Sequence, residues 1–335
     1  MIRVHVLNVG HGDCILLELP SGRLTVVDIN RSEKMDADSL TEVIQTWNPS
    51  GALYDRFLYG SGALDYKTLL QRAGYDIQLE DPIPYIKTLT QSPGNTDEAF
   101  RFISTHPHMD HLTGLSDLMR NVAMINAWVL PNSYTQELSK LTDSQKADWA
   151  LYRSFRDDIQ STVKVVRPFA RDTGNYWTED GITILAPDPA LLESEDESSD
   201  ANGMSYVLLI QHGWSKVVLG GDAEKATWDY IVENHGADIM DIQLLKASHH
   251  GRDSGYHQPA VKLMSPKYTA VSVGKKPDCD ASNKYRQYSD HVVSTRWHGT
   301  MVFDLYENGT IEFWPENDRC SNSFSMAMLG RVASL

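Results

Sequence analysis

The sequence lacks several features that would assign the protein to a special class. It has only three cysteines, Cys14, Cys279 and Cys320, and none belongs to a Cys-x-x-Cys pair. This usage argues against a disulfide framework and a cysteine zinc knuckle, and it indicates a reducing compartment. No run of about 18 apolar residues is present, so we expect no membrane-spanning helix. The first residues alternate like a strand and not like a secretory signal, and we therefore expect a cytoplasmic protein with no membrane partner.

Positive charge is also scarce. Lys and Arg number 30 against 45 Asp and Glu, which gives a net charge of −15. Proteins that act on duplex nucleic acid usually present a basic face, so a processive DNA binder is disfavoured. A small phosphodiester substrate remains compatible, because bound divalent metal ions would outweigh the surface charge locally. The content of 41% hydrophobic and 22% charged residues is that of an ordinary globular chain.

Strand-like and helix-like segments alternate along most of the chain. Short β-rich runs with Gly and Pro turns fill the first 30 residues, and a hairpin around Asn308-Gly309 is expected near the end. Between them, from residue 100 onward, strands alternate with helices in two similar halves. This pattern favours an α/β protein built as an αββα four-layer sandwich, with two sheets face to face and helices outside.

Three segments depart from this alternation. Residues 31–100 have helical spacing at 39–47 and 64–73, which predicts a helical insertion within a single domain of residues 1–335. The insertion can shape a site entrance, bind a protein partner or be simple decoration. Residues 136–162 predict a long helix, and the acidic run 193–200 is interpreted as a solvated loop.

The strongest chemical signal is Ser104-Thr105-His106-Pro107-His108-Met109-Asp110-His111, which follows an apolar strand and precedes a helix. His106 and His108 alternate and can point the same way, while Asp110 and His111 can reach a second ion. Imidazole and carboxylate ligands suit zinc, manganese or iron. We therefore expect a metal site here.

Two later segments can complete the coordination. Asp222 ends the apolar strand Leu219-Gly220-Gly221 and can bridge two ions, although it can also cap the following helix. His249 and His250 end the next strand. All three segments stand at carboxyl ends of strands, so they can meet at one edge of the sheets. Residue types alone do not choose between His249 and His250 as the ligand.

These motifs together resemble the metallo-β-lactamase superfamily, and within it the soluble hydrolase domain of the competence protein ComEC and its stand-alone relatives. The opening turn 7–14, Asp28, the segment 202–209 and the segment 249–252 contribute to the resemblance. It implies an αββα fold with two divalent ions, zinc or manganese. One ion would take His106 and His108, the other Asp110, His111 and one histidine of the pair, with Asp222 as the bridge. Many members use one more histidine, which this sequence replaces with the segment 202–205.

The expected activity is a metal-dependent hydrolase, most simply a phosphodiesterase or nuclease acting on a small or single-stranded phosphodiester. Asp110 and His249 are the candidate catalytic residues, with His250 as the metal ligand. Arg252, Lys284 and Asn202 are candidate substrate contacts, and Lys246 is a further cation beside the histidine pair. His11 in the Gly-His-Gly turn can also approach the site. The alternatives are hydrolysis of a carbon ester, lactone or amide, and a non-catalytic metal-binding sensor module.

Overall fold

The computed structural model describes residues 1–32, 79–91, 98–159, 163–198, 201–274 and 278–316. Two predicted helices of the insertion, at 39–47 and 64–73, lie outside the described residues, as does Cys320. Within the described part, no helix is both long enough and apolar enough to cross a bilayer.

The described strands form two sheets. In the first sheet the order is β14 (Ile311–Pro315), β13 (Met301–Leu305), β1 (Ile2–Val6), β2 (Ile15–Glu18), β3 (Leu24–Val27), β4 (Glu98–Ile103), β5 (Ala123–Trp128) and β6 (Lys164–Val166). In the second it is β12 (His291–Ser294), β11 (Tyr268–Val271), β10 (Leu244–Lys246), β9 (Ser215–Leu219), β8 (Val207–His212) and β7 (Ile182–Ala186).

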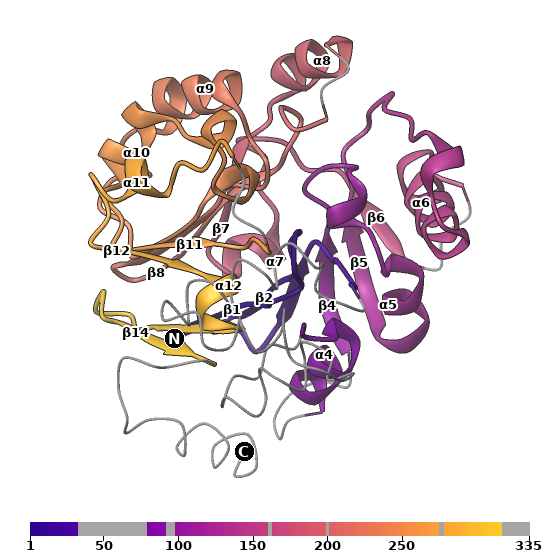
Figure 1. Ribbon diagram of the computed structural model, residues 1–335, viewed down its shortest axis with the longest axis horizontal. Helices are drawn as coiled ribbons and strands as arrows, with labels where there is room; N and C mark the ends of the chain where they lie inside the picture. The colour runs from indigo at the N-terminus through magenta and orange to yellow at the C-terminus, as the bar shows by residue number, and fades with distance from the viewer. Residues whose placement is uncertain (33–78, 92–97, 160–162, 199–200, 275–277, 317–335) are drawn as a thin grey trace, which may run out of the picture.

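Helices cover the outer faces of both sheets (Figure 1). Beside the first sheet lie α4 (Pro82–Thr90), α5 (Leu115–Asn121) and α6 (Asp143–Arg156). Beside the second lie α9 (Lys225–His235), α10 (Gln258–Met264) and α11 (Ser282–Tyr285). The shorter α7 (Asn175–Glu179), α8 (Pro189–Glu197) and α12 (Thr295–His298) belong to the connections. The predicted αββα sandwich is confirmed.

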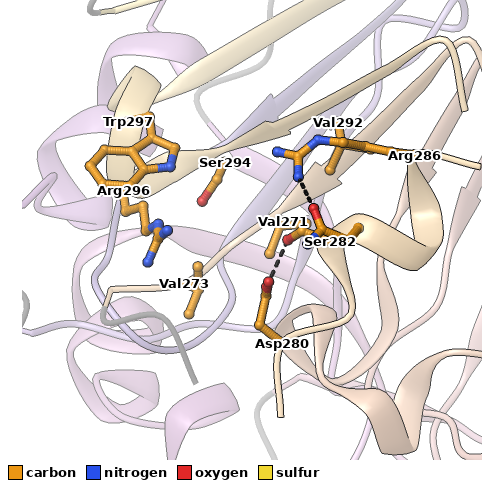
Figure 2. A pocket seen from close by; sticks show the side chains of 10 residues that line it. Val271, Val273, Asp280, Ser282, Arg286, Val292, Ser294, Arg296 and Trp297 are labelled. Atoms are coloured by element: carbon orange, nitrogen blue, oxygen red, sulfur yellow. Dashed lines mark hydrogen bonds between the residues drawn. The ribbon is translucent and has the colours of Figure 1, made fainter. Parts of the chain in front are cut away.

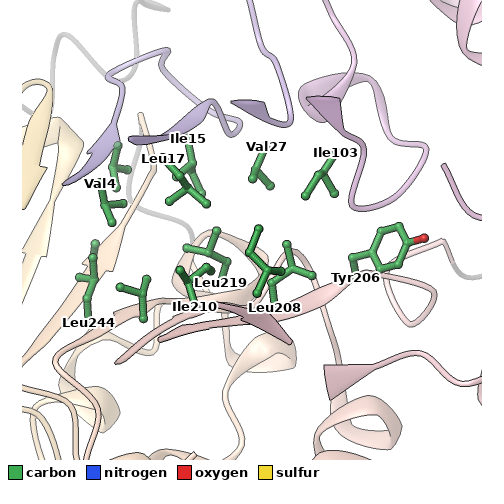
Figure 3. Packing of buried hydrophobic residues seen from close by; sticks show 14 of the residues in the cluster. Val4, Ile15, Leu17, Val27, Ile103, Tyr206, Leu208, Ile210, Leu219 and Leu244 are labelled. Carbon is green, nitrogen blue, oxygen red and sulfur yellow. The ribbon is translucent and has the colours of Figure 1, made fainter. Parts of the chain in front are cut away.

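Strand alternation explains the three apolar layers. Val4, Leu17 and Ile103 of the first sheet face Leu208 and Leu219 of the second across the central layer (Figure 3). The neighbouring residues in each strand point outward, against the flanking helices, where separate clusters form. Side chains on successive strand positions point to opposite faces, so both sheets can be apolar on both sides.

The parallel strands set the position of the site. Strands β9, β10, β11 and β12 pair in parallel, as do β3, β4, β5 and β6. Loops that leave the carboxyl ends of parallel strands meet at one edge of a sheet, where open α/β folds bind ligands. The metal motif follows β4, Asp222 follows β9 and the histidine pair follows β10.

Two element predictions were wrong. The acidic run 193–200, interpreted as a loop, lies largely in α8, which ends at Glu197. The long helix predicted for 136–162 is shorter among the described residues, where α6 spans Asp143–Arg156 and begins at a capping box in which Thr142 and Gln145 exchange hydrogen bonds. Of the predicted insertion, the structure describes the helix α4 and the approach to β4, which begins at Glu98.

Candidate metal centre

The motif after β4 forms a compact loop. His106 and His111 are fully buried, whereas His108 and Asp110 are half-buried. A short 3-10 turn at Met109–His111 reverses the chain directly after His108. The histidines and the carboxylate of one short motif therefore turn toward the same space, and His106 Nε2 lies 3.1 Å from His108 Nδ1.

Three imidazoles from two loops converge on one carboxylate oxygen. Oδ2 of Asp222 lies 3.7 Å from His106 Nε2, 3.4 Å from His111 Nε2 and 3.5 Å from His250 Nε2. The other oxygen, Oδ1, is buried without a hydrogen-bond partner among the described residues. A buried carboxylate oxygen without a partner is costly unless a cation satisfies it. Asp222 is therefore a candidate metal ligand, and its bridging role stays a prediction.

The backbone at the histidine pair is unusual. His249, His250 and Gly251 all have positive φ, at 49°, 53° and 77°. Non-glycine residues rarely adopt this conformation, and consecutive examples require support from the surrounding structure. This turn directs the two adjacent rings to different places. His250 is buried among the metal-type ligands, whereas His249 lies nearer the surface.

Further buried groups hold the rings in orientation. Nδ1 of His111 lies 2.8 Å from Asp28 Oδ2, and Asp28 also accepts hydrogen bonds from the amide and hydroxyl of Thr105. Nδ1 of His250 donates to the carbonyl of Ser272 at 3.1 Å. A proton held on Nδ1 leaves Nε2 with its lone pair directed at the cluster, as metal-bound histidines require.

The electrostatics of the cluster favour positive charge. Burial opposes protonation of His250, but Asp222, Asp110 and Asp13 raise its pKa to about 9. Burial likewise opposes protonation of His111, yet Asp222 and Asp28 raise its pKa well above the usual value. The pKa of Asp222 is well below its usual range because His250 and His111 outweigh its burial. The carboxylates thus create a field that a divalent cation would satisfy.

Two groups of side chains have the spacing of metal ligands. The first comprises Asp13, His111, Asp222 and His250, and the second His11, Asp110 and His250; within each, the ligand atoms lie within 4.8 Å of one another. Nitrogen and carboxylate donors of this kind suit zinc and manganese. The residues present therefore fit a metal site, and the structure contains a buried Asp/His group able to bind a metal ion.

His249 lies at the rim of this cluster. Its Nε2 is 4.0 Å from Asp222 Oδ2, and its Nδ1 is 3.2 Å from Glu224 Oε1 and 2.7 Å from Ser254 Oγ. A carboxylate at Nδ1 holds a proton there and leaves Nε2 facing the cluster. Glu224 was not identified from the sequence, because its position just before α9 looks like an ordinary helix start.

The candidate substrate contacts lie in different surroundings. Arg252 reaches the cluster, with Nη2 3.3 Å from His11 Nε2. Nδ2 of Asn202 donates to Glu224 at 3.4 Å. Lys284 is half-exposed and pairs with Asp253 at 2.9 Å, so its substrate role stays a prediction.

The interpretation of Lys246 as a substrate cation was wrong. Its side chain is fully buried, and Nζ lies 2.8 Å from Asp13 Oδ2. Asp13 also accepts from Ser272 and lies 3.5 Å from His250 Nδ1. Lys246, together with His250, keeps the pKa of Asp13 low in spite of its burial. The Gly-His-Gly-Asp turn thus brings Asp13 as well as His11 to the cluster, and its glycine-rich pattern was the available clue.

The chain is similar to a curated protein and to solved structures of metallo-β-lactamase fold proteins. No family model matches the chain. A curated relative, competence protein ComA of Neisseria gonorrhoeae, is 26% identical over 138 residues, which are 40% of this chain and 19% of that protein. The chain therefore spans about a fifth of its relative. The metallo hydrolase Igni18 of Ignicoccus hospitalis is 14% identical, with a TM-score of 0.43 over 93% of this chain and 98% of that one.

The chain is also similar to a second solved structure. The metallo-β-lactamase fold protein YhfI of Bacillus subtilis is 10% identical, with a TM-score of 0.41 over 94% of this chain and 100% of that one. The curated relative is a competence protein, in line with the resemblance stated from the motifs. The αββα sandwich with its Asp/His cluster at the carboxyl edge is the arrangement that those motifs predict.

Proposed function

We propose that this chain is a metal-dependent phosphodiesterase or nuclease that acts on a small or single-stranded phosphodiester. The observation that carries the proposal is Arg252, whose guanidinium stands beside His11 at the edge of the Asp/His cluster. A guanidinium next to a metal site is well suited to hold a phosphate, because it offers parallel N–H donors and a permanent charge. A neutral ester, lactone or amide offers such a cation a hydrogen-bond acceptor but no counter-charge.

The proposed ligand set is the one that the family resemblance implies, and the convergence of His106, His111 and His250 on Asp222 supports it. His106 and His108 would hold one ion, Asp110, His111 and His250 the other, and Asp222 would bridge them. His11 and Asp13 are additional candidate ligands from the opening turn. Two zinc or manganese ions would supply a hydroxide at neutral pH and stabilise negative charge on the phosphate.

The chain's own residues would bind the diester and transfer protons. Arg252 would orient the diester through one non-bridging oxygen. His249 would hold a proton at Nε2 and donate it to the leaving oxygen, while Glu224 keeps the opposite nitrogen protonated. Asp110, whose pKa is low because His111 and His250 outweigh its burial, would stay ionised.

The experiment compares substrates as well as variants. Protein loaded with zinc or manganese is assayed on bis-p-nitrophenyl phosphate, single-stranded DNA, a cyclic nucleotide and a lactone. We expect diester hydrolysis, and Arg252→Gln should lower kcat/KM for the diester by about tenfold or more, since a hydrogen bond to a charged group contributes roughly 1.5–3 kcal/mol. Arg153→Gln, on the exposed face of α6, is the control. Hydrolysis of the lactone alone would overturn the proposal.

A further inference from the structure

A pocket lies beside the metal cluster, at the same edge of the second sheet. Val271, Val273 and Ser294 form its floor, and α11 and α12 form its walls (Figure 2). The strand order β12-β11-β10-β9 places this pocket next to the loops that carry His250 and Asp222. Strands are spaced by about 4.8 Å, so β12 lies roughly 10 Å from β10. The pocket and the metal cluster are therefore neighbours along one edge.

Successive residues at the end of β11 contact the metal cluster and the pocket in turn. Ser272 contacts the metal cluster, where its carbonyl accepts from His250 and its hydroxyl donates to Asp13. The residues on either side, Val271 and Val273, line the pocket instead. Main-chain bonds also tie the pocket wall to the histidine loop, since the amide of Ala281 donates to Gly251 at 2.8 Å. The pocket lining and the metal cluster thus share one stretch of backbone and are joined by a main-chain hydrogen bond.

The lining has the chemistry of a phosphate site. The guanidinium groups of Arg286 and Arg296 enter from opposite walls (Figure 2). Asn283 Oδ1 accepts from Arg286 at 2.7 Å and holds it in place. On the floor, Ser294 Oγ is buried and has no hydrogen-bond partner among the described residues. The lining's acidic residue, Asp280, accepts from Ser282 at 2.7 Å. Two guanidiniums and a hydroxyl can together bind one phosphate.

An aromatic ring accompanies these cations. Trp297 lines the pocket, and the guanidinium carbon of Arg296 lies 4.2 Å from the centre of its ring. Indole faces stack on nucleobases, and an adjacent arginine adds to this interaction. We propose that this pocket binds a nucleotide, with its phosphate between Arg286 and Arg296 and its base on Trp297, next to the diester held at the metal centre. This inference rests on the proposed function for the identity of the neighbouring diester.

Binding to metal-free protein tests the pocket separately from catalysis. Adenosine 5′-monophosphate is titrated into chelator-treated protein by calorimetry. We expect saturable binding that weakens at least about tenfold in Arg286→Ala/Arg296→Ala and is unchanged in Arg153→Ala. Trp297→Leu should remove the preference for adenosine 5′-monophosphate over ribose 5-phosphate, while both are still bound. Melting curves verify that each variant is folded.

The outcomes separate the two proposals. Absence of saturable binding, or equal affinity in the double variant and the wild type, would overturn the nucleotide pocket even if the metal-loaded protein cleaves diesters. Weakened binding in the double variant together with inactivity on every diester would retain the pocket and contradict the phosphodiesterase. If ribose 5-phosphate binds as tightly as the nucleotide in the wild type, the pocket is not a nucleotide site.

Discussion

At the scale of single residues, the adjacent histidines 249 and 250 have different surroundings although they share one motif. His250 is buried with Nε2 among His111, Asp110 and Asp222, whereas His249 contacts Glu224 and Ser254 at the rim. His250→Ala should therefore lower the number of bound metal ions. His249→Ala should keep the metal content and lower turnover, by about 100-fold if it is a proton donor.

Metal analysis by plasma mass spectrometry and steady-state kinetics check this pair of variants. Glu224→Gln is the matched test of orientation, and it should alter the pH profile of turnover without changing the metal content. Full metal content in His250→Ala, with metal loss in His249→Ala, would exchange the two roles.

Among the site residues, the contiguous metal motif was predictable from the sequence, whereas the contacts of Asp13 were not. Four ligand-type residues within 106–111 are visible because they are contiguous and follow an apolar strand. The supporting contacts of Asp13 with Lys246 and Ser272 were not predictable, since they join residues separated by 233 and 259 positions. Only the folded sheets bring these partners together. Lys246 was misinterpreted for the same reason, because nothing local shows that a lysine at a strand end is buried against a distant carboxylate.

At the scale of elements, the sequence contains the start signal of α8, but the acidic composition of the run 193–200 led to the prediction of a loop. Asp188 accepts from the amide of Leu191 at 2.8 Å, and Pro189 opens α8. This N-cap and proline pattern is a regular helix signal, yet the acidic residues that follow favoured a loop. Charge alone does not exclude a helix, because α8 buries Leu192, leaves Glu193 exposed and has Asp196 accept a hydrogen bond from Ser133.

A buried ion pair connects the strand of the metal motif to the second sheet. Arg101 of β4 lies on the same face as Ile103, and its Nη2 is 2.6 Å from Asp180, just before β7. Both side chains are at most 1% exposed. Asp180→Ala should lower the free energy of unfolding by about 3–5 kcal/mol, because it leaves a buried guanidinium without its counter-charge. Denaturant unfolding measures this loss.

Two variants serve as controls for that prediction. Glu179→Ala removes a neighbouring, exposed partner of Arg23 and should cost at most about 1 kcal/mol. Arg101→Met with Asp180→Leu should recover much of the loss, since paired apolar replacements of a buried ion pair are often neutral. A loss in Asp180→Ala no greater than that in Glu179→Ala would show that the pair does not connect the sheets energetically.

At the scale of the whole molecule, the last two described strands, β13 and β14, complete the first sheet. The hairpin β13–β14 was predicted from Asn308-Gly309, but its partner was not, because either sheet edge can accept a hairpin. The structure pairs β13 with β1, with Val4 opposite Phe303. This closure brings Glu316 near Glu80, which precedes α4.

That closure makes stability depend on pH through Glu80. Burial, followed by the charges of Glu316 and Asp81, raises the pKa of Glu80 from 4.5 to about 7. The folded state therefore holds the proton more tightly than the unfolded state, and this contribution to stability is present below about pH 4.5 and is lost as pH rises to about 7. Glu80→Gln, which cannot ionise, should melt at a higher temperature than the wild type at pH 7.5 and at nearly the same temperature at pH 4.5. The difference corresponds to roughly 1–3 kcal/mol. Scanning calorimetry from pH 4 to 8, with exposed Glu193→Gln as the control, measures it. A difference that is the same at both ends of this pH range would show that Glu80 does not titrate as the fold predicts.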